Sequence, residues 1–294
     1  MAKVDGVLYR RILFGAILLV ISCGLLHLDW VTGRSFGIGA MVAYSMVFGL
    51  RELHRMLEAI APVPWKGPAR LFAFLVVAGQ VAQHELHNPD LKLPLGEAAM
   101  GTFVLAFLAA QLWYRPSRER LLQIVLALFG ALYIMFLGSY VLKVRYLDDA
   151  LDLPGHAHVG YAAILYLVLA AKGTDMFAFF AGRFLGKRKM IPWISPGKTW
   201  AGGVGGLLGC VGITYAFLVS SDLGRVFNWS AALPLGIIVG LSAMAGDLVE
   251  SLVKRSTAVK DSGGLVPEFG GVLDIIDCIL FVAPTIYYAA LIAA

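Results

Sequence analysis

Charged residues are scarce in this chain. Asp, Glu, Lys and Arg make up 15% of its 294 residues, whereas hydrophobic residues make up 59%, and the mean hydropathy is +0.79. A water-soluble domain needs more charged side chains than this to cover an apolar core. The composition therefore excludes a soluble globular protein and predicts an integral membrane protein.

Cysteine is also rare. Cys23, Cys210 and Cys278 each lie in an apolar run with no pairing spacing, so the sequence offers neither a disulfide framework nor a cysteine-based zinc site. His84 and His87 are one residue short of the i, i+4 spacing that places two zinc ligands on one helical face.

The net charge of +5 suits anionic lipids and anionic substrates, and nothing in it indicates a nucleic-acid partner.

Long apolar runs are the dominant feature of what remains. Most of them approach the roughly 20 residues that span a bilayer as a helix. The first run has no small-residue cleavage site after it, so we expect it to remain as a membrane helix. We predict an all-α polytopic membrane protein with about nine transmembrane helices, at residues 12–30, 36–50, 69–86, 95–114, 121–142, 158–181, 200–220, 231–247 and 272–293.

The distribution of Lys and Arg between the runs predicts the topology, because basic residues accumulate on the cytoplasmic side of a membrane. With the N-terminus inside, the cytoplasmic segments hold 18 of the 24 basic residues and the external segments hold five, while Lys172 lies within a run. We therefore expect a cytoplasmic N-terminus and an external C-terminus. The expected location is the bacterial inner membrane, with the active site facing the cytoplasm.

Charge within the apolar runs is concentrated in the second half of the chain. A charge inside a bilayer is costly and commonly serves a function. We therefore predict a transmembrane scaffold of about five spans at 1–150 and a catalytic part of about four spans at 151–294. The first five runs hold Asp29, Glu85 and Glu97 near their outer ends, whereas the charged residues in or next to the last four runs are Lys172, Asp175, Asp247, Glu250, Asp274 and Asp277.

Two pairs of carboxylates flank a basic loop near the C-terminus, and each pair is spaced i, i+3 as on one face of a helix. A divalent cation relieves the repulsion between converging carboxylates, and oxygen ligands without Cys or His favour Mg²⁺, with a second cation left open. The predicted metal ligands are Asp247, Glu250, Asp274 and Asp277. A helix that continues beyond the eighth run would align Ser251 and Lys254 with the first pair.

Salt bridges between helices are the alternative explanation of these charges, for example between Asp247 and Lys254 or between Asp277 and Lys198. The flexible pair Gly270-Gly271 and the cations of the intervening loop favour a ligand site for the group as a whole.

A second group of residues has the composition of a polyphosphate site. Cations, and glycines that expose backbone N–H groups, bind phosphates, and a nearby metal offsets the charge that develops on a phosphoryl centre. Arg183 and Lys198 lie beside glycines at run ends and are the better ligand candidates. The group is Asp175, Arg183, Ser195, Lys198 and Thr199.

The motifs of the second half follow one another in a specific order. The upstream segments run from Asp175 to Arg183 and from Ile194 to Thr199, and the downstream segment contains Ser251, Val253-Lys254-Arg255, Lys260-Asp261-Ser262-Gly263, Pro267, Gly270-Gly271-Val272, Asp274 and Asp277. This series resembles the phosphatidate cytidylyltransferases, also called CDP-diacylglycerol synthases. Two positions depart from that family's pattern, because Phe269 replaces a His and Ile275 replaces an Arg.

The resemblance implies a nucleotidyltransferase that transfers a cytidylyl group from CTP to phosphatidate, giving CDP-diacylglycerol and pyrophosphate for phospholipid biosynthesis. CTP, phosphatidate and membrane lipids are the expected partners, and a homo-oligomer stays an open option. The implied catalytic residues are Asp247, Asp274, Lys254 and Lys260. The implied substrate-binding residues are Asp175, Arg183, Ser195, Lys198, Thr199, Ser251, Arg255, Asp261, Gly270 and Gly271.

Two other functions use the same features. A CTP-dependent polyprenol or lipid kinase would also need metal-binding carboxylates, but it would release CDP rather than pyrophosphate. An ion-coupled transporter could use Asp175, Asp247 and Asp274 as an ion path, although polar groups in a transporter extend across the membrane depth, often in repeated halves. Here the polar groups lie on one side of the membrane and in the second half of the chain.

Overall fold

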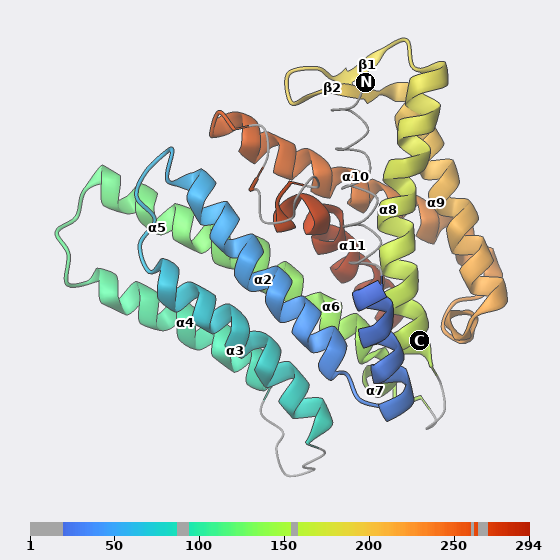
Figure 1. The fold of residues 1–294 in the computed structure, drawn as a ribbon, viewed down its shortest axis with the longest axis horizontal. Helices are drawn as coiled ribbons and strands as arrows, with labels where there is room; N and C mark the ends of the chain where they lie inside the picture. The colour runs from blue at the N-terminus through green and yellow to red at the C-terminus, as the bar shows by residue number, and fades with distance from the viewer. Residues whose placement is uncertain (1–19, 87–93, 154–157, 260–261, 264–269) are drawn as a thin grey trace, which may run out of the picture. The chain divides into compact units, whose positions relative to one another are not determined.

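The computed structural model describes residues 20–86, 94–153, 158–259, 262–263 and 270–294. Most of this chain is helical (Figure 1), and the helices form two compact units. The first unit comprises Met1–Leu142 and Thr257–Ile276, and the second comprises Lys143–Ser256 and Asp277–Ala294. The prediction of an all-α polytopic membrane protein is confirmed in its helical class, with one short hairpin that the sequence did not predict.

The first unit is built mainly from helices that follow one another along the chain. α2 packs against α3, and α3 packs against α4, so neighbours in sequence are neighbours in space (Figure 1). Its helices are Val20–Thr32, α2 (Phe36–Leu57), α3 (Lys66–Glu85), α4 (Leu95–Gln111) and α5 (Arg118–Gly130), which continues through the π-helical segment η1 (Ala131–Phe136) into α6 (Leu137–Arg145). The end of α6, from Lys143, belongs to the second unit.

The second unit contains three long helices that pack on one another, α8, α9 and α10. An antiparallel hairpin, in which Lys189 pairs with Thr199, connects α8 to α9. The elements are α7 (Leu147–Ala150), α8 (Val159–Leu185), β1 (Lys189–Ile191), β2 (Ser195–Thr199), α9 (Trp200–Ser220), the 3-10 segments η2 (Asp222–Arg225) and η3 (Trp229–Ala231), α10 (Ala232–Ser256) and α11 (Val272–Ala293). The first turn of α11 belongs to the first unit.

Side-chain oxygens stabilise several helix starts, because the first N–H groups of a helix have no partner within it. The buried Asp29 carboxylate accepts the N–H groups of Gly37 and Ile38 at the start of α2, each at 2.7 Å. At the start of α8, Asp148 accepts those of Val159 and Gly160 at 3.1 and 3.0 Å. Burial raises the pKa of the Asp148 carboxyl above its usual range, and these backbone hydrogen bonds oppose the shift.

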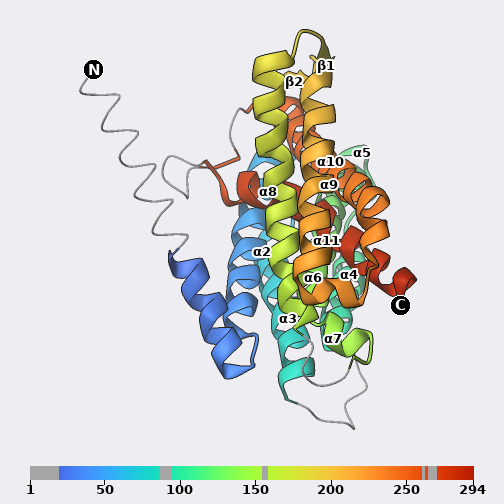
Figure 2. The same ribbon diagram turned by 90° about the vertical axis from the view of Figure 1, so that its right-hand side faces the viewer.

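Glycines allow α8 and α9 to approach closely, and the two helices lie side by side in Figures 1 and 2. A Cβ atom at Gly205 would lie 2.2 Å from the Cβ of Ala181, and one at Gly209 would lie 2.2 Å from the ring of Phe177. Small residues at helix contacts are typical of membrane proteins, where close packing replaces the hydrophobic driving force. Residues of α9 therefore reach close to the backbone of α8, the helix that carries Asp175.

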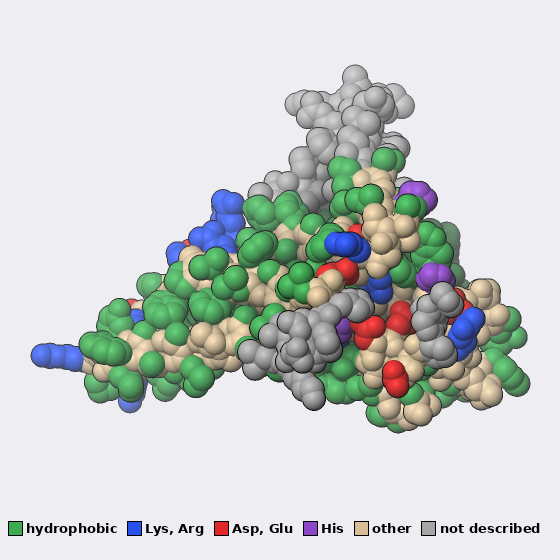
Figure 3. All heavy atoms as spheres, turned by 90° about the horizontal axis from the view of Figure 1, so that it is seen from below, with side chains coloured by type: hydrophobic (Ala, Val, Ile, Leu, Met, Phe, Trp, Pro, Cys, Tyr) green, Lys and Arg blue, Asp and Glu red, His purple; other side chains and the backbone are tan. Residues whose placement is uncertain are grey.

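Six described helices are long and apolar enough to cross a membrane, and hydrophobic side chains cover much of the face shown in Figure 3. The six are Phe36–Leu57, Arg118–Arg145, Val159–Leu185, Trp200–Ser220, Trp229–Ser256 and Val272–Ala293, with Val20–Thr32 and Leu95–Gln111 as shorter apolar helices. Three of the helices run well past the predicted apolar runs, since α2 ends at Leu57, α8 at Leu185 and α10 at Ser256. Charged residues continue these helices beyond their apolar parts.

The packing of α8 on α9 predicts opposite effects of one substitution at two glycines of α9. Gly205→Ala should destabilise the protein by roughly 1–3 kcal/mol, because its methyl group would overlap Ala181. A Cβ at Gly212 would meet no neighbouring atom within 4 Å, so Gly212→Ala should be neutral or should stabilise by up to about 1 kcal/mol. Thermal unfolding of both variants in detergent measures the difference, and equal midpoints would contradict the close packing.

Candidate functional site

Three carboxylates converge in the second unit. Asp247 and Glu250 lie one turn apart on α10, and Asp277 lies on α11. One ligand oxygen from each lies within 4.8 Å of the others. Glu250 and Asp277 are buried, whereas 29% of the Asp247 side chain is exposed. This group contains three of the four predicted metal ligands and is called the carboxylate cluster below.

Gly246 explains how α10 and α11 come close enough to form the carboxylate cluster. A Cβ atom at this position would lie 2.5 Å from the carbonyl oxygen of Asp277 and 2.9 Å from the Cα of Cys278. Any larger residue would therefore push the two backbones apart. The helix that continues past the eighth apolar run then places Glu250 on the same face as Asp247, as the i, i+3 spacing predicted.

Each acid of the carboxylate cluster lies beside a lysine. Lys198 of β2 contacts Asp247 at 2.8 Å, and Lys254 contacts Glu250 at 2.8 Å. The third lysine, Lys172 of α8, lies 3.6 Å from Asp277. Salt bridges thus form, but with partners other than the predicted pairs of Asp247 with Lys254 and of Asp277 with Lys198. The lysines offset the repulsion among the three acids.

Lys172 was not among the predicted site residues. It stands three residues before Asp175 on α8, and the Asp175 carboxylate accepts a hydrogen bond from the Cys278 thiol at 3.0 Å. Both residues of α8 therefore lie next to the part of α11 that carries Asp277. A Lys and an Asp at i, i+3 within an otherwise apolar run was the signal that could have identified the pair.

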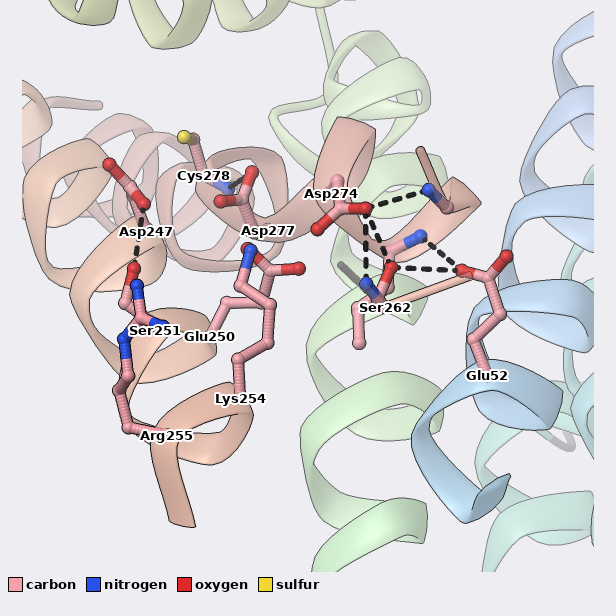
Figure 4. Close-up of polar contacts among 12 residues, drawn as sticks. Glu52, Asp247, Glu250, Ser251, Lys254, Arg255, Ser262, Asp274, Asp277 and Cys278 are labelled. Carbon is pink, nitrogen blue, oxygen red and sulfur yellow. Dashed lines mark hydrogen bonds and ion pairs between the residues drawn. The ribbon is translucent and has the colours of Figure 1, made fainter. Parts of the chain in front are cut away.

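Ser251 and Arg255 extend the carboxylate cluster along α10, as Figure 4 shows. The Ser251 hydroxyl donates to Asp247 at 3.3 Å. The exposed Arg255 donates from Nε to the carbonyl of Ile194 at 3.3 Å, next to the hairpin. The hairpin also brings Lys198 to α10, where its Nζ lies 3.4 Å from the carbonyl of Met244.

The remaining upstream candidates have structural contacts of their own. Thr199 is the N-cap of α9, and its hydroxyl accepts the N–H of Gly202 at 3.1 Å. Ser195 pairs with Ile191 in the hairpin, and Arg183 is exposed in the last turn of α8. Lys260 and Asp261 lie outside the described residues, as does Phe269.

Asp274 belongs to a second group of polar residues, in the first unit. Its Oδ2 atom accepts the Ser262 hydroxyl at 2.9 Å and the N–H of Gly271 at 2.6 Å. Gly270 adopts a φ of +92°, and a Cβ at Gly271 would lie 2.0 Å from the Ser262 hydroxyl, so the glycine pair is needed for this turn. These contacts hold the start of α11.

Glu52 of α2 completes the group around Asp274 and was missed by the sequence analysis. It is 3% exposed, and its Oε2 atom accepts the N–H of Leu273 at 2.9 Å and the Ser262 hydroxyl at 3.3 Å (Figure 4). A residue of the predicted scaffold therefore supports the C-terminal motif. The available signal was a Glu on the same helical face as Gly49 and Met56, where an apolar residue would be expected.

Known proteins resemble this chain over most of its length. The model of the cytidylyltransferase family matches residues 9–293. Phosphatidate cytidylyltransferase 5, chloroplastic, of Arabidopsis thaliana is 33% identical over 214 residues, which cover 68% of this chain and 53% of that protein. Phosphatidate cytidylyltransferase 4, chloroplastic, of the same plant is 30% identical over 295 residues, which cover 95% and 72%.

A bacterial relative matches over a similar extent. The phosphatidate cytidylyltransferase of Synechocystis sp. is 31% identical over 271 residues, which cover 85% of this chain and 86% of that protein. The family match extends over nearly the whole chain and includes both groups of acidic residues. This chain therefore belongs to the cytidylyltransferase family.

Proposed function

We propose that the protein is a phosphatidate cytidylyltransferase, which uses CTP to convert phosphatidate into CDP-diacylglycerol and pyrophosphate for phospholipid biosynthesis. The observation that carries the proposal is the convergence of three carboxylates with Lys198 and Lys254 in a chain of the cytidylyltransferase family. Membership of this family makes the protein an enzyme and argues against an ion-coupled transporter. The names of its relatives favour cytidylyl transfer over lipid phosphorylation.

The reaction forms one P–O bond and breaks another. A phosphate oxygen of phosphatidate attacks the α-phosphorus of CTP, and the bond to the β-phosphate breaks, so that its electron pair leaves with pyrophosphate. The attacking oxygen is already anionic, so no residue of the chain has to form a covalent intermediate. The chain has to hold two anions together and stabilise the charge on the leaving group.

Lysines beside acids are suited to that task. Lys198 and Lys254 neutralise Asp247 and Glu250 in this structure, and their long side chains can pair with phosphate oxygens instead. Arg255 and Arg183 are exposed on the same unit and add charge for the nucleotide phosphates. Lys260 stays a predicted partner of the leaving pyrophosphate or of the lipid phosphate. Lys172 is a positioning residue, since it contacts Asp277.

The donor set of the carboxylate cluster fits Mg²⁺, because it offers three carboxylates and no soft ligand. Asp247, Glu250 and Asp277 would hold the ion, and Asp274, one turn before Asp277 on α11, stays a predicted further ligand. When bound, a divalent cation supplies positive charge that stabilises the phosphoryl group during transfer.

The topology belongs to the same proposal. Nine spans, a cytoplasmic N-terminus and an external C-terminus would place the basic ends of α8 and α10 on the cytoplasmic side of a bacterial inner membrane, where CTP is available. The acyl chains of phosphatidate would stay in the bilayer. The 18 cytoplasmic basic residues against five external ones support this orientation.

Substitution of the carboxylate cluster should abolish the activity of the purified protein with phosphatidate, labelled CTP and Mg²⁺. Asp247→Asn and Asp277→Asn keep the shape of each side chain but remove its charge, so each should lower the rate by roughly 100-fold or more. Asp222→Asn, at a half-buried aspartate that pairs with the exposed Arg225, is the matched control and should keep the wild-type rate. Release of labelled pyrophosphate identifies cytidylyl transfer, whereas release of CDP would indicate a kinase.

Magnesium should stabilise the wild-type protein in the absence of substrates. Saturating ion at about 100 times its Kd corresponds to about 2.7 kcal/mol of added stability, which raises the thermal unfolding midpoint by a few degrees. Asp277→Asn should lose most of this rise, and EDTA should remove it from the wild type. An equal rise in both proteins would show that the ion binds elsewhere.

Cysteine labelling tests the orientation. Ser256 at the end of α10 and Ser220 at the end of α9 are both exposed, whereas Ser262 is buried and would label poorly. In a Cys23→Ser background, a membrane-impermeant maleimide should label Ser220→Cys in intact cells and Ser256→Cys only after the membrane is opened. The reverse pattern would place the C-terminal motif outside and separate it from cytoplasmic CTP.

A further inference from the structure

The first unit contains a cavity of about 530 Å³ with a basic lining. Arg51 and Arg55 come from the last turns of α2, and Lys66 and Arg70 come from the first turns of α3. Membrane topology alone is enough to explain one or two basic residues near the end of a span. Four cations around one cavity are more than that role requires, because they repel one another unless an anion lies between them.

The acidic residues of the lining leave part of this charge uncompensated. Glu58 pairs with Lys66. Glu52 also lines the cavity; its Oε2 atom accepts hydrogen bonds from Leu273 and Ser262, whereas its Oε1 atom has no hydrogen-bond partner among the described residues. Two carboxylates therefore stand against four cations, a net charge of +2 in the described lining, and neither Arg51 nor Arg55 has an ion-pair partner among the described residues. This excess matches the charge of a phosphate monoester dianion.

A buried histidine gives a second, independent indication of a ligand. His54 lines the cavity, is 2% exposed, and its Nδ1 atom has no hydrogen-bond partner within the described part of the chain. Gly130 lies against the other side of the His54 ring, where a Cβ atom would lie 3.0 Å from Nε2. A buried polar atom without a partner costs roughly 1–3 kcal/mol, which an anion that accepts a hydrogen bond from Nδ1–H would recover.

We propose that this cavity binds a phosphate-bearing group. Arginine guanidinium groups form paired hydrogen bonds with phosphate oxygens, and a cavity of this volume has room for a phosphate together with part of the molecule that carries it. Nothing in the proposed function of the carboxylate cluster assigns these residues a role.

The cavity is connected to the C-terminal motif within the same unit. Gly263 lies in its lining, and the neighbouring Ser262 donates to both Glu52 and Asp274. A ligand that contacts Arg55 or Arg70 therefore lies beside the residues that hold the start of α11. In a cytidylyltransferase the phosphate comes from the lipid or from the nucleotide. The identity of that source rests on the proposed function, whereas the existence of the site does not.

Direct binding to the full-length protein in detergent tests the proposal without measuring turnover. The probes are dioctanoyl phosphatidate and CTP, with dioctanoylglycerol and cytidine as matched compounds that lack phosphate. Arg55→Gln and Arg70→Gln should each raise the Kd of a phosphate-bearing probe at least about tenfold in calorimetry, since a charge-assisted hydrogen bond is lost. Arg55→Lys, which keeps the charge but loses the paired geometry, should have an intermediate effect.

Arg118→Gln is the control, because Arg118 is an exposed arginine of the same unit outside the cavity, and its Kd should stay within about twofold of the wild type. Weaker binding of phosphatidate alone identifies the lipid as the source, and weaker binding of CTP alone identifies the nucleotide. If Arg70→Gln unfolds at a lower temperature, Arg51→Gln replaces it, because Arg51 is exposed.

Wild-type affinity of the cavity variants for both probes would overturn the proposal, as would a wild-type protein that binds neither. The outcome is separate from that of the proposed function. A protein that binds phosphatidate through Arg55 but transfers no cytidylyl group would retain the site and lose the enzyme assignment. An active protein whose cavity variants bind both probes with wild-type affinity would retain the enzyme assignment and lose the site.

Discussion

Repulsion among three neighbouring acids is the constraint on which the second unit depends. One ligand oxygen each of Asp247, Glu250 and Asp277 lies within 4.8 Å of the others, two of these acids are buried, and carboxylates this close repel one another unless counter-charges lie beside them. The three lysines that provide them come from α8, β2 and α10. The β1–β2 hairpin thereby acquires a role, because it carries Lys198 to Asp247. Gly246 supplies the close approach of α10 and α11 that makes the arrangement necessary.

The spacing of residues along one helix was enough to predict which acids share a face, but not which lysine each acid meets. Asp247 and Glu250 lie together because α10 continues to Ser256, as the i, i+3 pattern required. Lys254 is four residues from Glu250 and seven from Asp247, and it forms its ion pair with the nearer acid, Glu250. Asp247 is then left to Lys198, and that choice depends on the hairpin, which no periodicity in the sequence revealed.

Long-range contacts explain the rest of what the sequence did not predict. Glu52 and Ser262 are 210 residues apart, and Glu52 and Leu273 are 221 apart, so no local pattern relates them. The first half looked like scaffold because its apolar runs carry few charges. The structure shows that one charge in that half, buried on α2, supports the turn before α11. The glycine pair was recognised as flexible, whereas its structural role is a positive φ at Gly270 and a close approach at Gly271.

α11 connects the two groups of acids through the chain itself. Its first turn belongs to the first unit, where Ser262 and Gly271 hold Asp274, and the remainder belongs to the second, where Asp277 meets Lys172. Asp274 and Asp277 are three residues apart on one helix, yet each is held by groups of its own unit, Asp274 by Ser262 and Gly271 and Asp277 by Lys172. The i, i+3 spacing predicts that two side chains share a helical face, but it does not reveal which parts of the chain pack against each of them.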